Sequence, residues 1–396
     1  MLTAHAFVLP KRNEMMRNLC LAILLAFVAS SCKKNKDEVV PKEPLKTAAV
    51  SQQVDKLIND IKIPGVAVAL VGPDGIVWSK TAGMANLEKK EAVTDKTVFK
   101  LGSVAKPFIA FSVMKLVEQG KLNLDANVND YLPFTVQNPK NPGKKITLRT
   151  LLSHTSGIID TAYERHLAED FVVTERDHPA PISEYIRSML EPTGKYYSPD
   201  SFLDDREKAV YSYSNVGAAL AAYIVELTAK ENFDTWTTRQ FIAPLNTTTL
   251  TWHLRDFASQ PYAVPYGPAL QPWGKYSMVD YCTGGLHSNL TDLATFARML
   301  VNNGNVNGKQ IISASSLDAM GQVQYPDIKS TQGLFWERYK LDNRPIFGHS
   351  GDVWGSHSLL YINPENKRAA IILYNRDLED DQRPEINKLL QLLLTL

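Results

Sequence analysis

Residues 99–119 read FKLGSVAKPFIAFSVMKLVEQ, and the rest of the chain is organised around this stretch. From Pro107 to Val117 it is apolar on nearly every side, because only one serine and one lysine interrupt the run. A helix that is apolar all round lies in the interior of a large domain. Pro107 would fall in the first helical turn, where its missing N–H costs little. The stretch therefore predicts a buried central helix.

Ser103 and Lys106 stand three residues apart at the start of this predicted helix. Side chains at that spacing share one face. A lysine beside a buried apolar run loses hydration, which lowers its pKa towards that of a base. The S-x-x-K pattern alone is weak, since it also begins at Ser30 and Ser31, and Ser103 could simply cap a helix. Its position nevertheless favours a serine nucleophile with its base beside it.

Composition limits the class of protein. The chain has 396 residues, of which 44% are hydrophobic and 21% charged, as in a soluble globular protein large enough for two lobes. Its 43 basic and 42 acidic residues leave a net charge of +1, which argues against nucleic-acid binding. The three cysteines form no C-x-x-C spacing and the histidines no H-E-x-x-H pattern, so we expect neither a metal nor another cofactor.

The N-terminus has the pattern of a targeting segment. Arg17 precedes eleven apolar residues, 19–29, and two serines then lead to Cys32. This is a secretory signal, expected over residues 1–31, and its core is too short to span a bilayer, which takes about 20 residues. The run ending in cysteine resembles a bacterial lipoprotein signal, which implies cleavage before Cys32, lipid attachment there and a protein exported to a cell-envelope membrane. A plain secretory signal is the alternative.

Residues 32–50 are mostly polar and are expected to form a solvated tether ahead of a folded domain at 51–396. Residues 1–14 precede Met15 and Met16, either of which would begin the signal naturally, so the true start is left open.

Strand patterns lie at both ends of the folded part and helical patterns in between. Predicted strands cover 65–71, 76–79, 344–349, 356–362 and 368–374. Predicted helices cover 54–61, 146–153, 182–190, 216–229, 232–242, 289–302 and 384–396. The turn GPDG at 72–75 joins the first two strands as a hairpin. The expected fold is α+β: one antiparallel sheet built from both chain ends (about 51–100 and 277–396), flanked by helices, with an inserted mostly helical lobe at about 101–276.

Two further motifs follow the serine in the chain. Tyr213 opens a Y-S-N sequence just before a predicted helix, and His349 opens an H-S-G sequence on a predicted strand. Together with Ser103, this ordered set resembles the serine β-lactamase/penicillin-binding protein superfamily, in the branch of class C β-lactamases, D-Ala-D-Ala carboxypeptidases and related esterases. The sequences LLSHTSG at 151–157 and GGL at 284–286 support the same branch. The resemblance covers roughly residues 63–375 and implies a β-lactamase/transpeptidase-like fold.

The resemblance also implies catalytic roles. Ser103 attacks an acyl carbon, a neutral Lys106 takes its proton, and Tyr213 moves protons to the leaving group and from the deacylating water. A phenol has an ordinary pKa of about 10, so a basic tyrosine would need lysines on either side, and only Lys106 is visible in the sequence.

The same resemblance implies a set of substrate-binding groups. Asn215 is expected to bind the acyl-side amide, and His349, Ser350 and Gly351 to bind substrate along the strand, with Gly351 leaving room for it. The backbone N–H groups of the nucleophilic serine and of Asp352 would form an oxyanion hole. The loops 159–181, 195–209 and 261–276 would set specificity, His154 is interpreted as a structural turn residue and the 284–285 glycine pair as tight packing.

His349 departs from the class C pattern, in which a lysine occupies this position. A histidine titrates near neutral pH and is a poorer partner for a substrate carboxylate, which disfavours efficient β-lactamase activity. The preferred hypothesis is therefore a hydrolase of an amide, D-peptide or ester, acting on a small molecule or a cell-wall peptide. A β-lactamase is the alternative, and a non-catalytic cell-wall-binding sensor is the alternative of another class.

Overall fold

The computed structural model describes residues 47–341 and 343–396, all within one compact unit. The expected signal peptide, the lipidation site at Cys32 and nearly all of the expected tether lie outside the described residues. The first helix, α1 (Ala48–Asn59), begins inside the stretch expected as tether and six residues earlier than the pattern at 54–61 predicts. Val50 is buried, because it packs with Val54 and Leu57 under the sheet.

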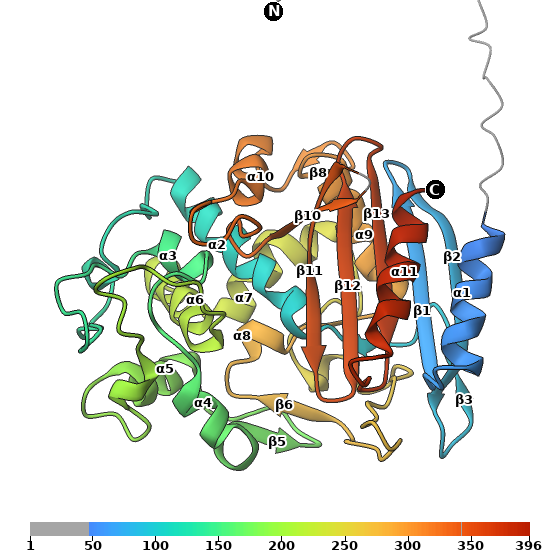
Figure 1. Cartoon of the computed structure of the whole chain (residues 1–396), viewed down its shortest axis with the longest axis horizontal. Coiled ribbons are helices and arrows are strands. Elements are labelled where there is room, and N and C mark those ends of the chain that lie inside the picture. The colour runs from blue at the N-terminus through green and yellow to red at the C-terminus, as the bar shows by residue number, and fades with distance from the viewer. Residues whose placement is uncertain (1–46, 342) are drawn as a thin grey trace, which may run out of the picture. The chain divides into compact units, whose positions relative to one another are not determined.

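A seven-stranded antiparallel sheet forms the centre of the protein, in the order β10-β11-β12-β13-β1-β2-β3 (Figure 1). Its strands are β1 (Gly65–Gly72), β2 (Gly75–Asn86), β3 (Glu91–Ala92), β10 (Glu337–Leu341), β11 (Arg344–Val353), β12 (Ser356–Asn363) and β13 (Arg368–Tyr374). The first and last parts of the chain meet where β1 pairs with β13, with Val68 opposite Ile372. The sheet built from both chain ends is thereby confirmed.

Strand β1, an interior strand of the sheet, is buried along its whole length because helices cover both faces of the sheet. Val66, Val68 and Leu70 contribute to one apolar core, and Ala67 and Ala69 to the other. This division follows from the two-residue repeat of a strand, which sends alternate side chains to opposite faces.

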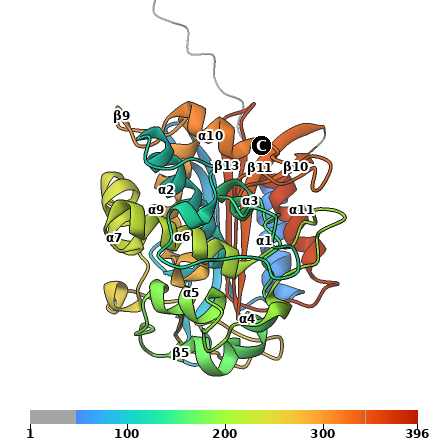
Figure 2. The same ribbon diagram turned by 90° about the vertical axis from the view of Figure 1, so that its left-hand side faces the viewer.

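The helices form a layer on each face of this sheet (Figure 2). On one face lie α1 and α11 (Arg383–Leu394), which contact each other. On the other lies α9 (Leu290–Val301), which begins where expected, at the cap Asn289. No helix in residues 47–341 and 343–396 is long and apolar enough to cross a membrane.

The helical part lies between the two groups of strands in the chain. Its helices are α2 (Lys106–Glu118), α3 (Leu148–Leu152), α4 (Thr161–His166), α5 (Ile182–Leu190), α6 (Asn215–Ala229), α7 (Phe233–Thr237), α8 (Tyr281–Gly284) and, later, α10 (Ala314–Gly321). Short strand pairs join β4 (Phe99–Lys100) to β7 (His287–Ser288), β5 (Val172–Thr174) to β6 (Tyr276–Met278), and β8 (Asn305–Val306) to β9 (Lys309–Gln310).

The central helix α2 is buried as predicted. Phe108 stacks on Phe296 of α9 with ring centroids 4.6 Å apart, and Phe111 meets the same ring edge-on at 5.8 Å. On its other side α2 packs on α6, where a run of alanines permits close approach. Because α2 touches both the sheet side and the helical side, its first turn is held rigidly.

Three local expectations differ from the structure. The loop expected at 159–181 contains α4 and β5, and β5 pairs with β6, about 100 residues later in the chain. The helix expected at 232–242 ends at Thr237 and continues as a wider π-helical turn. The strand expected at 344–349 extends to Val353, since its hairpin partner β12 continues to pair with it.

Candidate active site

Ser103 and Lys106 lie where a short 3-10 turn (Gly102–Ala105) leads into α2. The Nζ of Lys106 lies 3.0 Å from the Oγ of Ser103, 2.7 Å from the Oδ1 of Asn215 and 3.1 Å from the carbonyl oxygen of Thr283. The lysine is fully buried. Burial lowers its pKa to about 8, because desolvation disfavours the ammonium form. A neutral amine beside the serine is thus accessible near physiological pH.

Two buried carboxylates limit the extent to which burial lowers the pKa of Lys106. Asp280 makes the larger Coulombic contribution and Asp160 the next. Burial raises the pKa of Asp280, whose carboxylate accepts hydrogen bonds from the Thr283 hydroxyl at 2.5 Å and from the Tyr163 hydroxyl at 3.4 Å. Sequence reasoning missed both carboxylates, since neither belongs to a recognisable motif.

Asp160 organises the start of α6, which carries Asn215. Its carboxylate accepts hydrogen bonds from the Ser214 hydroxyl at 2.7 Å, the Asn215 N–H at 2.6 Å and the Val216 N–H at 3.1 Å. A carboxylate at the N-terminus of a helix satisfies N–H groups that have no partner within the helix. Asp160 therefore fixes the backbone from which Asn215 reaches Lys106.

Tyr213 faces Lys106 across the cleft, and the Nζ of Lys106 lies 4.8 Å from the centroid of the tyrosine ring. Burial raises the pKa of Tyr213 well above its ordinary value, and a hydrogen-bonding interaction with Ser103 opposes part of that rise. The phenol is therefore protonated at neutral pH. It can donate a proton, whereas the amine of Lys106 is the group beside Ser103 that can accept one.

His154 supports Tyr213 from behind. Its ring lies 4.3 Å from the tyrosine ring, and its Nδ1 accepts a hydrogen bond from the Ser214 N–H at 3.1 Å. Its carbonyl oxygen accepts the Ser212 N–H at 2.9 Å, so His154 holds the backbone on both sides of Tyr213. Burial lowers its pKa well below the ordinary range, which keeps the imidazole neutral. His154 adopts a left-handed φ of 57°, in keeping with the expected turn.

His349 and Ser350 line the same cleft from β11. The His349 ring centroid lies 6.4 Å from that of Tyr213, and its Nδ1 lies 2.5 Å from the carbonyl oxygen of Ser350. Burial lowers the pKa of His349, despite the opposing negative charge of Glu337. At neutral pH this histidine is therefore uncharged and offers no cation to a substrate.

Close packing against the nucleophile segment requires a glycine at 351, and its expected role in binding substrate stays a prediction. A Cβ there would overlap the carbonyl oxygen of Leu101, on the segment leading to Ser103, and Gly351 is not among the lining residues of the cleft. Gly102, at a left-handed φ of 53°, would likewise place a Cβ 3.0 Å from the nitrogen of Asp352. The two glycines let β11 approach the segment that carries Ser103.

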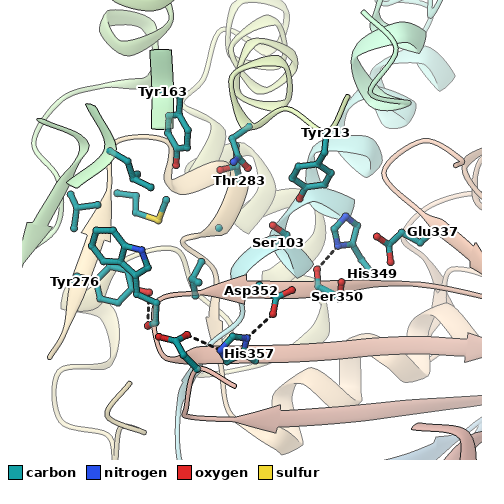
Figure 3. Close-up of a pocket in the computed structure, with 18 of the residues that line it drawn as sticks. Ser103, Tyr163, Tyr213, Tyr276, Thr283, Glu337, His349, Ser350, Asp352 and His357 are labelled. Carbon is teal, nitrogen blue, oxygen red and sulfur yellow. Dashed lines mark hydrogen bonds and ion pairs between the residues drawn. The ribbon is translucent and has the colours of Figure 1, made fainter. Parts of the chain in front are cut away.

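The cleft encloses about 460 Å³ and has two chemically distinct ends (Figure 3). Tyr163 and Tyr276 lie on one side of Ser103, whereas Tyr213, His349 and Glu337 lie on the other. Apolar residues line the cleft from α4, the π-helical turn that follows it, β5, β6, the end of β11 and the β11–β12 turn: Tyr163, Leu167, Val172, Tyr276, Met278, Val353 and Trp354. Of the three loops expected to set specificity, 159–181 lines the cleft, 261–276 reaches it only at Tyr276, and 195–209 contributes no lining residue.

A charged cluster holds the end of β11. The His357 Nδ1 lies 2.6 Å from a carboxylate oxygen of Asp352, and its Nε2 lies 3.0 Å from Asp377. Arg383 lies 3.4 Å from the same oxygen of Asp352. These carboxylates raise the pKa of His357 against the effect of burial. In the described part of the chain, no group of three or more His, Cys, Asp or Glu side chains could hold a metal ion.

The architecture is shared with solved structures of β-lactamases and penicillin-binding proteins. The octameric penicillin-binding protein homologue from Pyrococcus abyssi matches with a TM-score of 0.69 and 21% sequence identity, covering 84% of this chain and 74% of that chain. A class C β-lactamase from Rhodobacter sphaeroides matches with a TM-score of 0.65 and 20% identity, covering 86% of this chain and 98% of that chain. The fold is therefore β-lactamase/transpeptidase-like, as expected.

Sequence comparison identifies the family. The family model described as Beta-lactamase matches residues 49–395. Penicillin-binding protein 4 of Amycolatopsis lactamdurans is 28% identical over 346 residues, which cover 84% of this chain and 86% of that protein. The chain belongs to the β-lactamase family, within the superfamily of serine acyl-transfer hydrolases that unites β-lactamases and penicillin-binding proteins.

Proposed function

We propose that this protein is a serine hydrolase that forms an acyl-enzyme with an amide, D-peptide or ester substrate. One observation carries the proposal: the Nζ of the buried Lys106 lies 3.0 Å from the Oγ of Ser103, with its pKa lowered to about 8. A nucleophilic hydroxyl needs a base within hydrogen-bond reach, and this lysine can act as one near neutral pH.

In acylation, the Oγ of Ser103 bonds to the acyl carbon while its proton passes to neutral Lys106. The bond to the leaving group breaks, and the leaving atom takes a proton from the phenol of Tyr213. The N–H groups of Ser103 and Asp352 stabilise the oxyanion between these steps. Ser103 lies in the first helical turn, where N–H groups have no partner within the helix. Asn215, which accepts from Lys106, can use its amide N–H group on the acyl-side carbonyl of the substrate.

In deacylation, water attacks the acyl carbon and the acyl bond to Ser103 breaks. The water proton passes to Tyr213, which gave up its own proton during acylation, and the protonated Lys106, which contacts Tyr213, holds the proton that returns to the serine. The serine regains its proton and the carboxylic acid product leaves. No further acidic side chain is assigned to this step.

β-Lactamase activity is the less favoured alternative. Neutral His349 replaces the lysine of the class C pattern and offers no positive charge to the carboxylate of a penicillin. A non-catalytic cell-wall sensor is disfavoured because the described residues keep serine, lysine and tyrosine in contact. We also propose a cell-envelope location with a lipid anchor at Cys32, supported by the signal pattern in the sequence.

Intact-mass measurement after brief incubation with a penicillin and, separately, with an activated aryl ester tests the proposal. We expect an acyl adduct or ester turnover in the wild type, the same result in the control Ser315→Ala, which changes an exposed serine, and neither signal in Ser103→Ala. Rapid penicillin loss without a lasting adduct would establish a β-lactamase. Ester turnover that persists in Ser103→Ala would exclude Ser103 as the nucleophile.

A further inference from the structure

Glu337 is a carboxylate of the cleft that the mechanism leaves unused. It lies at the start of β10, opposite Gly348 of β11, and is half-buried. Its Oε2 accepts hydrogen bonds from the Tyr361 hydroxyl at 2.6 Å and the Tyr339 hydroxyl at 3.3 Å. Two tyrosines therefore hold one carboxylate oxygen, and both are neutral donors that leave the negative charge in place.

The other two acidic residues that line the cleft have cationic partners. Asp352 contacts His357 and Arg383, and Asp377 contacts His357. Glu337 forms no ion pair with any lysine, arginine or histidine in the described part of the chain. It is thus the cleft carboxylate whose charge the surrounding described residues do not compensate.

The side of the cleft on which Glu337 lies follows from the position of the proton donor. A leaving group must lie next to the phenol of Tyr213 to be protonated. His349 and Glu337 lie on that same side of Ser103, whereas Tyr163 and Tyr276 lie on the opposite side (Figure 3). The leaving group therefore points towards Glu337, and the acyl group points into the other end.

The acyl end is apolar and well supported. Val172 and Met278 are partners across the β5–β6 pair, and Tyr276 packs against Trp354 with ring centroids 5.7 Å apart. Leu167 and Tyr163 complete this end of the cleft. Burying apolar substrate area against such a surface is favourable, because it removes that area from water.

We propose that this site selects an apolar acyl group and a leaving group without a carboxylate, and that Glu337 is the residue that rejects a negatively charged leaving group. The inference rests on the proposed acyl-enzyme function and narrows its substrates to esters or amides with neutral or cationic leaving groups. Two like charges at close range in a partly buried cleft repel strongly, because the effective dielectric constant is below that of water. Neutral His349, between Glu337 and the serine, supplies no positive charge to offset that repulsion.

Two phenylacetyl esters test the leaving-group preference: one of 3-hydroxybenzamide and one of 3-hydroxybenzoate, which differ in one negative charge. We expect the wild type to have a kcat/KM at least about tenfold higher for the benzamide ester. Glu337→Gln keeps an acceptor for both tyrosines and should bring the ratio close to one, and Glu337→Lys should reverse it. Glu91→Gln, on β3 at the opposite edge of the sheet, changes net charge equally and should keep the wild-type ratio.

Equal rates on the two esters, or a ratio that Glu337→Gln leaves unchanged, would overturn the proposal. If the wild type hydrolyses neither ester faster than Ser103→Ala does, the proposed hydrolase function is wrong instead. Calorimetric binding of both intact esters to Ser103→Ala then still tests the charge preference, and equal affinities would reject it.

A separate substitution tests whether the acyl group binds at the apolar end of the cleft. Val172→Thr replaces a methyl group by a hydroxyl of nearly the same size, and we expect it to lower the preference for phenylacetyl over acetyl esters at least about threefold. The matched change Val77→Thr, at an exposed position of β2, should not alter that preference. An unchanged preference in Val172→Thr would place the acyl group elsewhere.

Discussion

The imidazole of His154 packs against the phenol ring of Tyr213 with ring centroids 4.3 Å apart and ring planes inclined by 32°, and its backbone and Nδ1 hold the N–H groups on either side of that tyrosine. A residue read from the sequence as a turn former therefore also positions the candidate proton donor. The ring contact restricts the orientation of the tyrosine ring, and the two hydrogen bonds fix the backbone segment from which the ring projects.

The His154→Ala substitution is expected to lower kcat about tenfold to a hundredfold, because small misplacements of a proton donor are costly. KM should change little, since His154 does not line the cleft. Asparagine at position 154 tolerates the left-handed backbone and can still accept the Ser214 N–H. His154→Asn should therefore be more stable than His154→Ala, although it also loses the ring contact with Tyr213. Steady-state kinetics together with thermal unfolding measure both effects, and His178→Ala is the control. A wild-type kcat in His154→Ala would contradict this role.

The pH dependence of kcat/KM should report Lys106. The neutral amine is the active form, so activity rises with pH through a midpoint at about 8. Asp280 raises the pKa of Lys106 more than any other charge, so Asp280→Asn should shift this midpoint to lower pH. Asp318→Asn, at an exposed position on α10, should leave it in place. A midpoint that does not move in Asp280→Asn would mean that another group titrates.

Replacing the candidate base should stabilise the protein while abolishing activity. Below pH 8, folding buries a protonated Lys106, and a lowering of its pKa from 10.5 to about 8 corresponds to a cost of roughly 3 kcal/mol. Lost hydrogen bonds to Asn215 and Thr283 offset part of the gain, so Lys106→Met should raise the free energy of unfolding by about 1–2 kcal/mol at pH 7.

The difference in unfolding free energy between Lys106→Met and the wild type should depend on pH. Between pH 8 and 10.5 the unfolded chain binds the proton that the folded lysine has lost, so wild-type stability recovers with rising pH. The difference between the wild type and Lys106→Met in urea unfolding should therefore narrow from pH 7 to pH 10. A difference that widens over this range would contradict a buried lysine with a lowered pKa.

The cluster around His357 should stabilise the end of β11 in its protonated form. Asp352 and Asp377 raise the pKa of His357, so its contribution to stability is fully present below about pH 6.5 and declines as pH rises through the raised value. We expect His357→Gln to cost about 1–2 kcal/mol of unfolding free energy at pH 6 and less at pH 9. His166→Gln, in a more exposed pair on α4, serves as the control. A constant cost across this pH range would argue that His357 is neutral in the folded protein.

Much of the frame of this protein follows from local sequence patterns. The apolar stretch after Pro107 predicts a buried helix, and the apolar runs at 65–71 and 368–374 predict strands; the structure has all three and buries them. The spacing of Ser103 and Lys106 places them on one helical face, and the structure puts their reactive atoms 3.0 Å apart. These features depend on neighbours within one element, which is why periodicity and spacing are sufficient to predict them.

The electrostatics of the candidate site depend on contacts between elements that are far apart in the chain. Asp160 and Asp280 set the electrostatics of Lys106 from segments 54 and 174 residues away in sequence, and neither residue carries a local signal. β5 likewise pairs with β6, about 100 residues later in the chain. Local patterns are sufficient for the α+β class and the buried helix, which follow from the repeats of helix and strand, and for the candidate nucleophile, which follows from the spacing of Ser103 and Lys106. Three features depend on the tertiary structure: the lowered pKa of Lys106, the packing of Gly351 against Leu101, and the position of Glu337 in the cleft. Burial, steric contact and Coulombic interaction all depend on distance in space, which local sequence patterns do not give.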